Sequence, residues 1–150
     1  MAASNVLAIE AELVARLQER LAASGMPQVY VLTAADLAGV TEEKQLVPAV
    51  HVVYQGYGVA ETSHNGRAAR VTQTWLAVVA TRNARGIKAG EAARAQAGEL
   101  AGHASAALMG WKPGAAAKPL RLVPGPGAGF SAGHQYLPLA FEAEIVLQAD

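Results

Sequence analysis

Two strand-forming segments flank an Asn65-Gly66 pair, and this arrangement constrains the fold more than any other feature of the chain. Residues 48–57 and 70–82 are rich in β-branched and aromatic side chains, as strands are. Asn-Gly is the preferred pair of a type I′ turn, so the two segments are predicted to form an antiparallel hairpin. Residues 59–67 would make its tip polar and protruding. Neither face of the second strand is cleanly polar, so we expect helices to cover one face of the sheet and a neighbouring subunit the other.

Two long helices are predicted from apolar spacing. The larger apolar residues of the first recur every three or four positions, at Val6, Ile9, Leu13, Leu17 and Leu21. Gly25 and Pro27 end this helix. The second helix spans residues 88–109 and ends at Gly110, and its inward side chains are mostly small: Ala93, Ala97, Leu100, Ala104 and Leu108. Small side chains let a helix approach a sheet closely.

The remaining segments complete an α+β pattern. Residues 28–33 are predicted to form a strand buried on both faces, which a short helical piece at 33–37 joins to the next strand by a crossing segment. Residues 120–123 form a short strand, whereas 124–130 have almost no regular-structure propensity. The last strand, 136–147, alternates apolar residues with Glu142 and Glu144. We therefore predict one domain over residues 1–150: a mainly antiparallel sheet of about five strands, two long helices packed on one face and a protruding hairpin.

Charge and composition exclude several classes of protein. Among 150 residues, 12 Lys and Arg balance 12 Asp and Glu, so the chain lacks the basic field of a dedicated nucleic-acid binder. The absence of cysteine excludes a disulfide scaffold, a thiolate metal site and a cysteine nucleophile. The N-terminus does not resemble a secretory signal, and no apolar run is long enough for a membrane helix. We expect a soluble protein without a membrane partner, made in the cytoplasm.

The sequence offers no pattern typical of catalysis or of cofactor and metal binding. The four histidines fall on different predicted elements without ligand spacing, and we interpret them as a scattered solvated or hydrogen-bonded set: His51, His64, His103 and His134. Gly125, Gly127 and Gly129 superficially resemble a phosphate loop, but no helix follows them. No nucleophile elbow or zinc-protease motif occurs. We therefore predict a protein that is not an enzyme and that needs no cofactor.

Charged and aromatic residues leave more than one interpretation open at each position. The basic residues gather at the two ends of the predicted hairpin, as solvated loops, as partners in intersubunit ion pairs or, third, as contacts to a phosphate backbone: Arg67, Arg70, Arg82, Arg85 and Lys88. Glu142 and Glu144 lie on the outer face of the last strand, either as a solvated edge or facing an aqueous channel or a neighbour's arginine. Trp75 and Trp111 are typical of core or interface anchors.

The order of these parts resembles the tail terminator family of Mu-like and related long-tailed phages. The resemblance rests on the opening helix, the strand at 29–33, the strand at 48–57 with its extended hairpin, and two short motifs. These motifs are Gly110-Trp111-Lys112-Pro113 after the Ala-rich helix and Phe141-Glu142-Ala143-Glu144 in the closing strand. The resemblance covers essentially the whole chain.

This resemblance implies a structural virion protein without a cofactor. Subunits of such a family assemble into a ring, expected to be a hexamer, that caps the tail tube, ends its polymerisation and forms the joint to the head. The implied partners are further copies of the chain, the tail tube protein and a head–tail connector protein, and DNA passes through the lumen without specific binding. The implied location is the head-proximal end of the virion tail.

The resemblance also suggests which residues meet a neighbouring subunit or the tube. These are the hairpin tip with the nearby arginine and the Gly-rich segment: His64, Asn65, Gly66, Arg67, Arg70, Gly127, Gly129 and Phe130. Glu142 and Glu144 are candidates for lumen or intersubunit charge. Two alternatives stay open, namely a head–tail joining or tail completion protein, and a small-ligand-binding α+β module with a closed pocket.

Overall fold

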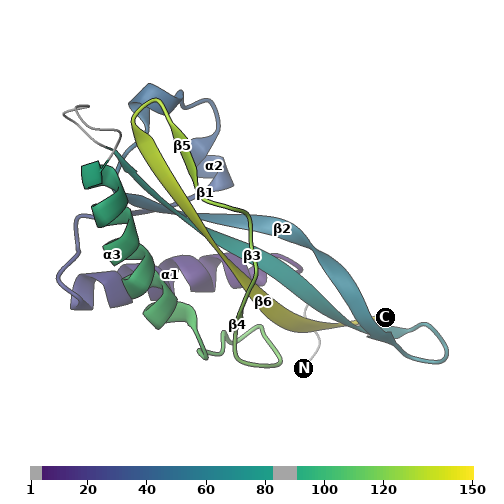
Figure 1. Ribbon diagram of the computed structural model, residues 1–150. Coiled ribbons are helices and arrows are strands. Elements are labelled where there is room, and N and C mark those ends of the chain that lie inside the picture. The colour runs from purple at the N-terminus through teal and green to yellow at the C-terminus, as the bar shows by residue number, and fades with distance from the viewer. Residues whose placement is uncertain (1–4, 83–90) are drawn as a thin grey trace.

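The computed structural model describes residues 5–82 and 91–150, and the side chains of the last helix from residue 93 onward. Its elements follow the predicted order, and the predicted α+β fold is confirmed (Figure 1). The helices and strands are α1 (Ala8–Ala23), β1 (Tyr30–Thr33), α2 (Ala34–Leu37), a 3-10 turn η1 (Glu42–Lys44), β2 (Ala49–Thr62), β3 (Ala68–Arg82), α3 (Glu91–Leu108), β4 (Arg121–Val123), β5 (Gly129–Ser131) and β6 (His134–Gln148). Arg85, Lys88 and the predicted start of the second helix lie outside the described residues.

One mixed sheet organises these elements, with strand order β1-β2-β3-β6-β4 and with β5 also paired to β6. Among the strands of the described residues, only β1 and β2 run parallel, as the predicted crossing connection requires. The sheet has one strand more than expected, because Gly129–Ser131 pairs with β6 in a segment predicted to be irregular. A turn with positive φ at Ala132 and Gly133 makes this pairing possible.

The two long helices cover the same face of the sheet, which we call the helix face. Ile9, Leu13, Leu17 and Leu21 of α1 are all buried there, as their four-residue spacing predicts. Gly25 takes the left-handed conformation after α1, and backbone bonds from Gly25 and Met26 close the helix end. The small inward residues of α3 are also buried, so the helix lies close to β3 and β6. Trp75 and Phe141, paired across β3 and β6, lie at the centre of this core.

The opposite face, which we call the open face, is partly covered by the chain itself. The segment joining β1 to β2 crosses from one sheet edge to the other, where Glu42 accepts a hydrogen bond from the Tyr136 hydroxyl at 2.6 Å. Ser131 and Gln45 contribute further hydrogen bonds to this contact. A neighbouring subunit is therefore not needed to cover this end of the face. Beyond it, Leu76 and Val78 stay partly exposed.

The predicted hairpin is longer than expected and has a third strand. β2 continues past residue 57 to Thr62, and β3 begins at Ala68 rather than at residue 70. β6 pairs with β3 as far as Ala68 and Gln148. The three strands form an arm that extends from the helices (Figure 1). Two register shifts along β2, next to Gln55 and Ala60, add to the twist of the arm.

Candidate assembly surfaces

The arm ends in a five-residue loop, Ser63 to Arg67, rather than in the predicted two-residue type I′ turn. Gly66 has a φ of +74°, whereas Asn65 lies outside the left-handed region that a type I′ turn would require. The Asn65 side chain instead accepts hydrogen bonds from the Ser63 hydroxyl and the Arg67 backbone N–H. His64 is exposed at the end of the loop. The loop thus holds its own shape and presents His64 outward.

The C-terminus contacts the end of the arm. The Arg67 guanidinium donates a hydrogen bond to the carbonyl of Asp150, and the Ala149 N–H donates to the Arg67 carbonyl at 2.7 Å. Arg67 is therefore engaged within its own chain.

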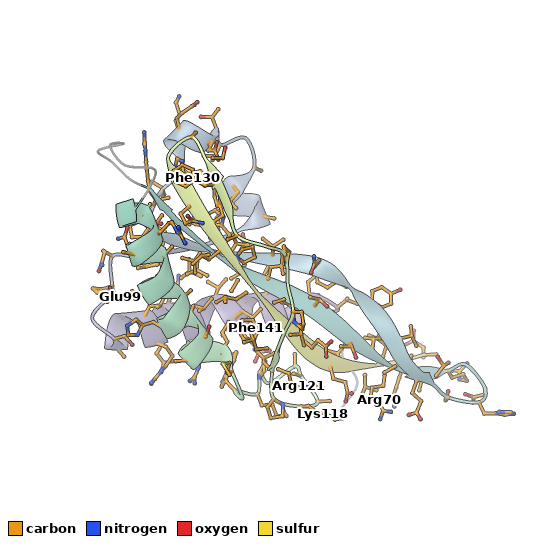
Figure 2. The ribbon with its side chains drawn as sticks, viewed as in Figure 1. Arg70, Glu99, Lys118, Arg121, Phe130 and Phe141 are labelled. Atoms are coloured by element: carbon orange, nitrogen blue, oxygen red, sulfur yellow. The ribbon has the colours of Figure 1, made fainter. Side chains whose placement is uncertain are left out.

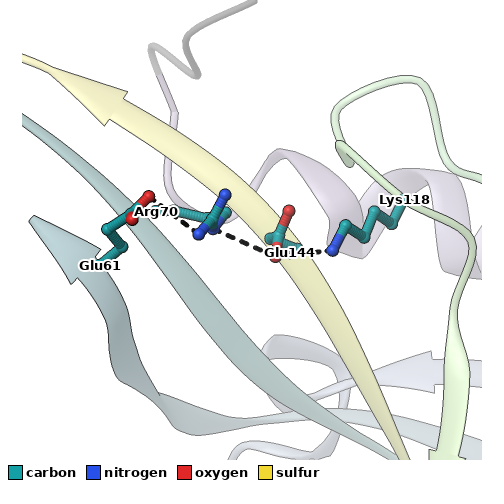
Figure 3. Close-up of polar contacts among 4 residues, drawn as sticks. All are labelled: Glu61, Arg70, Lys118 and Glu144. Atoms are coloured by element: carbon teal, nitrogen blue, oxygen red, sulfur yellow. Dashed lines mark hydrogen bonds and ion pairs between the residues drawn. The ribbon is translucent and has the colours of Figure 1, made fainter.

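A row of four charged residues crosses the open face of the arm, from Glu61 of β2 to Lys118 in the loop before β4 (Figure 3). The Arg70 guanidinium lies 2.8 Å from a Glu61 carboxylate oxygen and 3.6 Å from one of Glu144. The Lys118 ammonium lies 3.6 Å from the same Glu144 oxygen. The exposed Arg70–Glu61 pair contributes little stability. Glu144 is mostly buried and lies between Arg70 and Lys118, so the row holds four side chains in one line. Both Arg70 and Glu144, predicted as intersubunit charges, thus have partners in their own chain.

Glu142 lies next to this row, also on the open face. It is paired with Arg121 of β4. Residues directly paired across antiparallel strands share a face, so Arg121 also lies on the open face. Figure 2 shows Lys118 and Arg121 close to each other, with Arg70 farther out along the arm.

The Gly-rich segment lies at the opposite end of the sheet from the arm. Phe130 of β5 is 49% exposed, and it lines an open depression of about 350 Å³ with Arg94 and Leu137. Figure 2 shows Phe130 far from Arg70. The predicted interface residues therefore form two separate groups: His64, Asn65, Gly66, Arg67 and Arg70 with Glu142 and Glu144 on the arm, and Gly127, Gly129 and Phe130 near β5.

A polar cluster lies beneath the crossing segment. The Tyr136 hydroxyl is partly buried and bonded to Glu42, and these two effects raise the pKa of Tyr136 to about 12. The same hydrogen bond lowers the pKa of Glu42, and burial lowers the pKa of His51. His134 is fully buried, and neither of its ring nitrogens has a hydrogen-bond partner in the described structure. The prediction of solvated or hydrogen-bonded histidines is wrong for His134, because the crossing segment covers it. The Nε2 atom of His51 is likewise buried without a hydrogen-bond partner in the described structure.

Several exposed residues at the sheet edges were not identified from the sequence. Tyr57 and Val59 of β2 are 64% and 57% exposed, and Leu122 of β4 is 46% exposed. Their exposure depends on which strands lie at the edges, which periodicity does not reveal. The sequence did contain one signal of a basic edge at β4, because the only charged residues between 109 and 133 are cations: Lys112, Lys118 and Arg121.

Metal-holding clusters and membrane-spanning helices are both absent from the part of the chain that the structure describes. Within residues 5–82 and 91–150, no group of three or more His, Asp or Glu residues is placed to hold a metal ion. No helix in that part of the chain is both long and apolar enough to span a bilayer.

These features define a class: a small α+β domain with a helix-covered sheet and a three-stranded arm. The family model described as phage tail terminator protein matches residues 5–149. The chain therefore belongs to the phage tail terminator family and is a structural protein of the phage tail, located in the virion. None of the curated proteins matches the sequence significantly.

Proposed function

We propose that this protein forms a homohexameric ring that caps the tail tube, stops its polymerisation and joins the tail to the head. Membership of the phage tail terminator family over residues 5–149 is the observation that carries the proposal. The chain acts as a single domain, at the head-proximal end of the tail. Its partners are further copies of itself, the tail tube protein and a head–tail connector protein.

The ring acts through two unlike surfaces. One surface imitates the docking face of a tube ring and binds the last ring of the tube. The other surface differs from that face, so no further tube ring binds and polymerisation stops. A head-to-tail contact repeated by rotation closes such a ring. The long arm and the β5 turn project at opposite ends of the sheet and supply candidate contacts for the two surfaces.

DNA passes through the lumen of the ring without specific binding. A net formal charge of zero supports this part of the proposal, because strong phosphate contacts would hold the DNA during ejection. Assembly takes place in the host cytoplasm before the head is joined.

The ring is tested by light scattering of the purified protein across a concentration series, with electron microscopy of any large species. Six copies of a 15.4 kDa chain have a mass of about 92 kDa (6 × 15.4) and are expected to appear as rings. A protein that stays monomeric, alone and with purified tubes, would contradict the proposal.

The position of the ring in tail assembly is tested by omission. Tails assembled without this protein are expected to exceed the normal length, because nothing stops tube growth. Tails of normal length that fail to join heads would instead indicate a head–tail joining or completion protein.

A further inference from the structure

The outer edge of β2 is a long strand edge without a partner. β1 pairs only with Ala49 to Val52, so residues 53–62 have no strand on that side in the described structure. Proteins usually protect such edges with charges or proline, but this stretch contains a single charged residue, Glu61, and no proline. It exposes Tyr57 and Val59 instead. The two register shifts next to Gln55 and Ala60 bend this edge but leave it uncovered, and an exposed apolar edge of this length is typical of a strand-pairing site.

The opposite edge of the sheet is also open and carries the opposite charge. β4 pairs only with β6 in the described structure, and Leu122 is exposed there. The charged residues of this edge are the cations Lys112, Lys118 and Arg121. Along the open edge of β2, residues 53–62, the charged residue is the anion Glu61. Glu61 also contacts Arg70, and Lys118 contacts Glu144, within the chain, so a contact between the two edges would extend this row of ion pairs into the next copy. Carboxylate on one edge and cations on the other complement each other, whereas neither edge complements a second copy of itself.

The exposed apolar residues of both edges lie on the same face of the sheet. Leu122 is paired with Phe141, while Tyr57 and Val59 are paired with Gln73 and Val71, so all three exposed apolar residues lie on the helix face.

The charged residues lie on the other side of the sheet. Arg121 is paired with Glu142, and Glu61 with Arg70, which places both on the open face. A sheet that continued from one chain into the next would bring apolar residues together on one face and opposite charges together on the other.

We propose that the β4 edge of one copy pairs with residues 53–62 of β2 in a second copy, so that the sheet continues from chain to chain. Leu122 packs against Tyr57 and Val59 of the neighbour. Lys118 and Arg121 face the neighbour's Glu61. Strands alternate in direction from β2 to β4, so copies related by rotation about an axis along the strands bring β4 antiparallel to the neighbouring β2.

This contact is head-to-tail, and it therefore closes into a ring when the rotation between copies permits. This proposal rests on the proposed ring and identifies the surface through which its subunits contact one another.

Cysteine cross-linking tests the contact directly, because the chain has no cysteine of its own. Leu122→Cys is mixed with Tyr57→Cys or with Val59→Cys, and each mixture is oxidised or treated with a short bismaleimide. All three positions are exposed, so the variants are expected to fold, which circular dichroism checks. Each mixture is expected to give cross-linked dimers that contain one copy of each variant. A chain carrying both Leu122→Cys and Val59→Cys is expected to give a ladder of higher oligomers.

The controls separate this contact from others. Each single variant alone is expected to stay uncross-linked, since a head-to-tail contact does not bring a residue next to itself. Dimers of Val59→Cys alone would overturn the proposal in favour of a two-fold contact between β2 edges. Glu19→Cys, an exposed position on α1, serves as the collision control. If it cross-links to Leu122→Cys as fast as Val59→Cys does, the cross-links report random collision and the proposal is overturned.

Charge reversal provides a second, independent readout. Lys118→Glu with Arg121→Glu is expected to reduce the assembled fraction at least tenfold, and Glu61→Lys in the partner chain is expected to restore mixed assembly. If the wild-type chain forms 92 kDa rings but neither the mixtures nor the charge variants behave as expected, this edge contact is wrong while the ring stands. If the wild-type chain forms no oligomer and no cross-link, both the contact and the ring are wrong.

Discussion

Gln73 places an amide inside an otherwise apolar face of β3. It is fully buried, its Nε2 donates to the Val6 carbonyl at 2.6 Å, and its Oε1 accepts from the Trp75 indole at 3.0 Å. The amide thus connects the chain before α1 to the centre of the core, and both of its polar atoms have partners.

We expect Gln73→Leu to lower the free energy of unfolding by ~2–4 kcal/mol, because the indole N–H and the Val6 carbonyl lose their partner. Urea denaturation of the purified protein measures this change. Adding Trp75→Phe to Gln73→Leu removes one of the two unpaired groups and is expected to cost less than the sum of the single changes. Strict additivity of the two substitutions would contradict the hydrogen bond.

The polar cluster under the crossing segment predicts how stability depends on pH. Burial lowers the pKa of His51 below 6.5, so the unfolded chain binds this proton more readily and stability falls as pH drops below about 6.5. Glu42 has a pKa below 4.5, so its contribution is lost as pH falls further. Tyr136 has a pKa of about 12 rather than 10, so stability also falls as pH rises from 10 toward 12.

Denaturation midpoints measured from pH 4 to pH 11 check these slopes. His51→Gln is expected to flatten the slope just below pH 6.5 and to leave the alkaline slope unchanged. Tyr136→Phe is expected to do the reverse. An unchanged slope below pH 6.5 in His51→Gln would assign that titration to another group.

At the scale of elements, α1 holds the loop between α3 and β4 in place. The Glu12 carboxylate accepts hydrogen bonds from the backbone N–H groups of Gly114 and Ala115, the latter at 3.0 Å. Nearby, Arg16 donates to the Ala107 carbonyl and lies over the Trp111 ring at 5.2 Å. The loop carries Lys118, so these contacts determine where that cation lies relative to Glu144.

Glu12→Ala is expected to cost about 1.5–3 kcal/mol of stability, the usual value of hydrogen bonds to a charged group. Glu19→Ala on the same helix, where the side chain is exposed, serves as the control and is expected to change stability by less than about 0.5 kcal/mol. Equal effects of the two variants in thermal melts would refute the proposed role of Glu12.

Gly125 and Gly127 lie in one loop but differ in their surroundings. A Cβ atom on Gly125 would come within 2.9 Å of the Ala140 Cβ, whereas nothing lies within 4 Å of one on Gly127. Gly125→Ala is expected to destabilise the fold by about 1–3 kcal/mol through overpacking, and Gly127→Ala to stay within about 0.5 kcal/mol. Matched chemical denaturation curves compare them, and equal curves would show that the loop does not lie against β6.

For the whole molecule, the charge difference between the two sheet edges predicts a salt dependence. If opposite edges meet, raising the salt concentration from 0.05 M to 0.5 M is expected to shift the assembled fraction toward monomer, because salt screens exposed charges. Light scattering at fixed protein concentration measures the shift. The Lys118→Glu and Arg121→Glu double variant is expected to lose this dependence, and a salt response that it retains would assign the effect to other charges.

The sequence alone determined the elements whose signal is local. The spacing of Ile9, Leu13, Leu17 and Leu21 specified both α1 and its buried face. Alternation along β6 specified which of its side chains meet the helices, because each pattern repeats with the period of its own backbone.

Tertiary structure decided the features that depend on distant pairing. Four features follow from which strands lie side by side. They are the burial of His134, the third strand of the arm, the pairing of Glu144 with Arg70 and Lys118, and the open edges at Tyr57 and Leu122. Such contacts join residues dozens of positions apart, and no local period encodes them. The same pairing that completes the core also leaves two edges of opposite charge exposed.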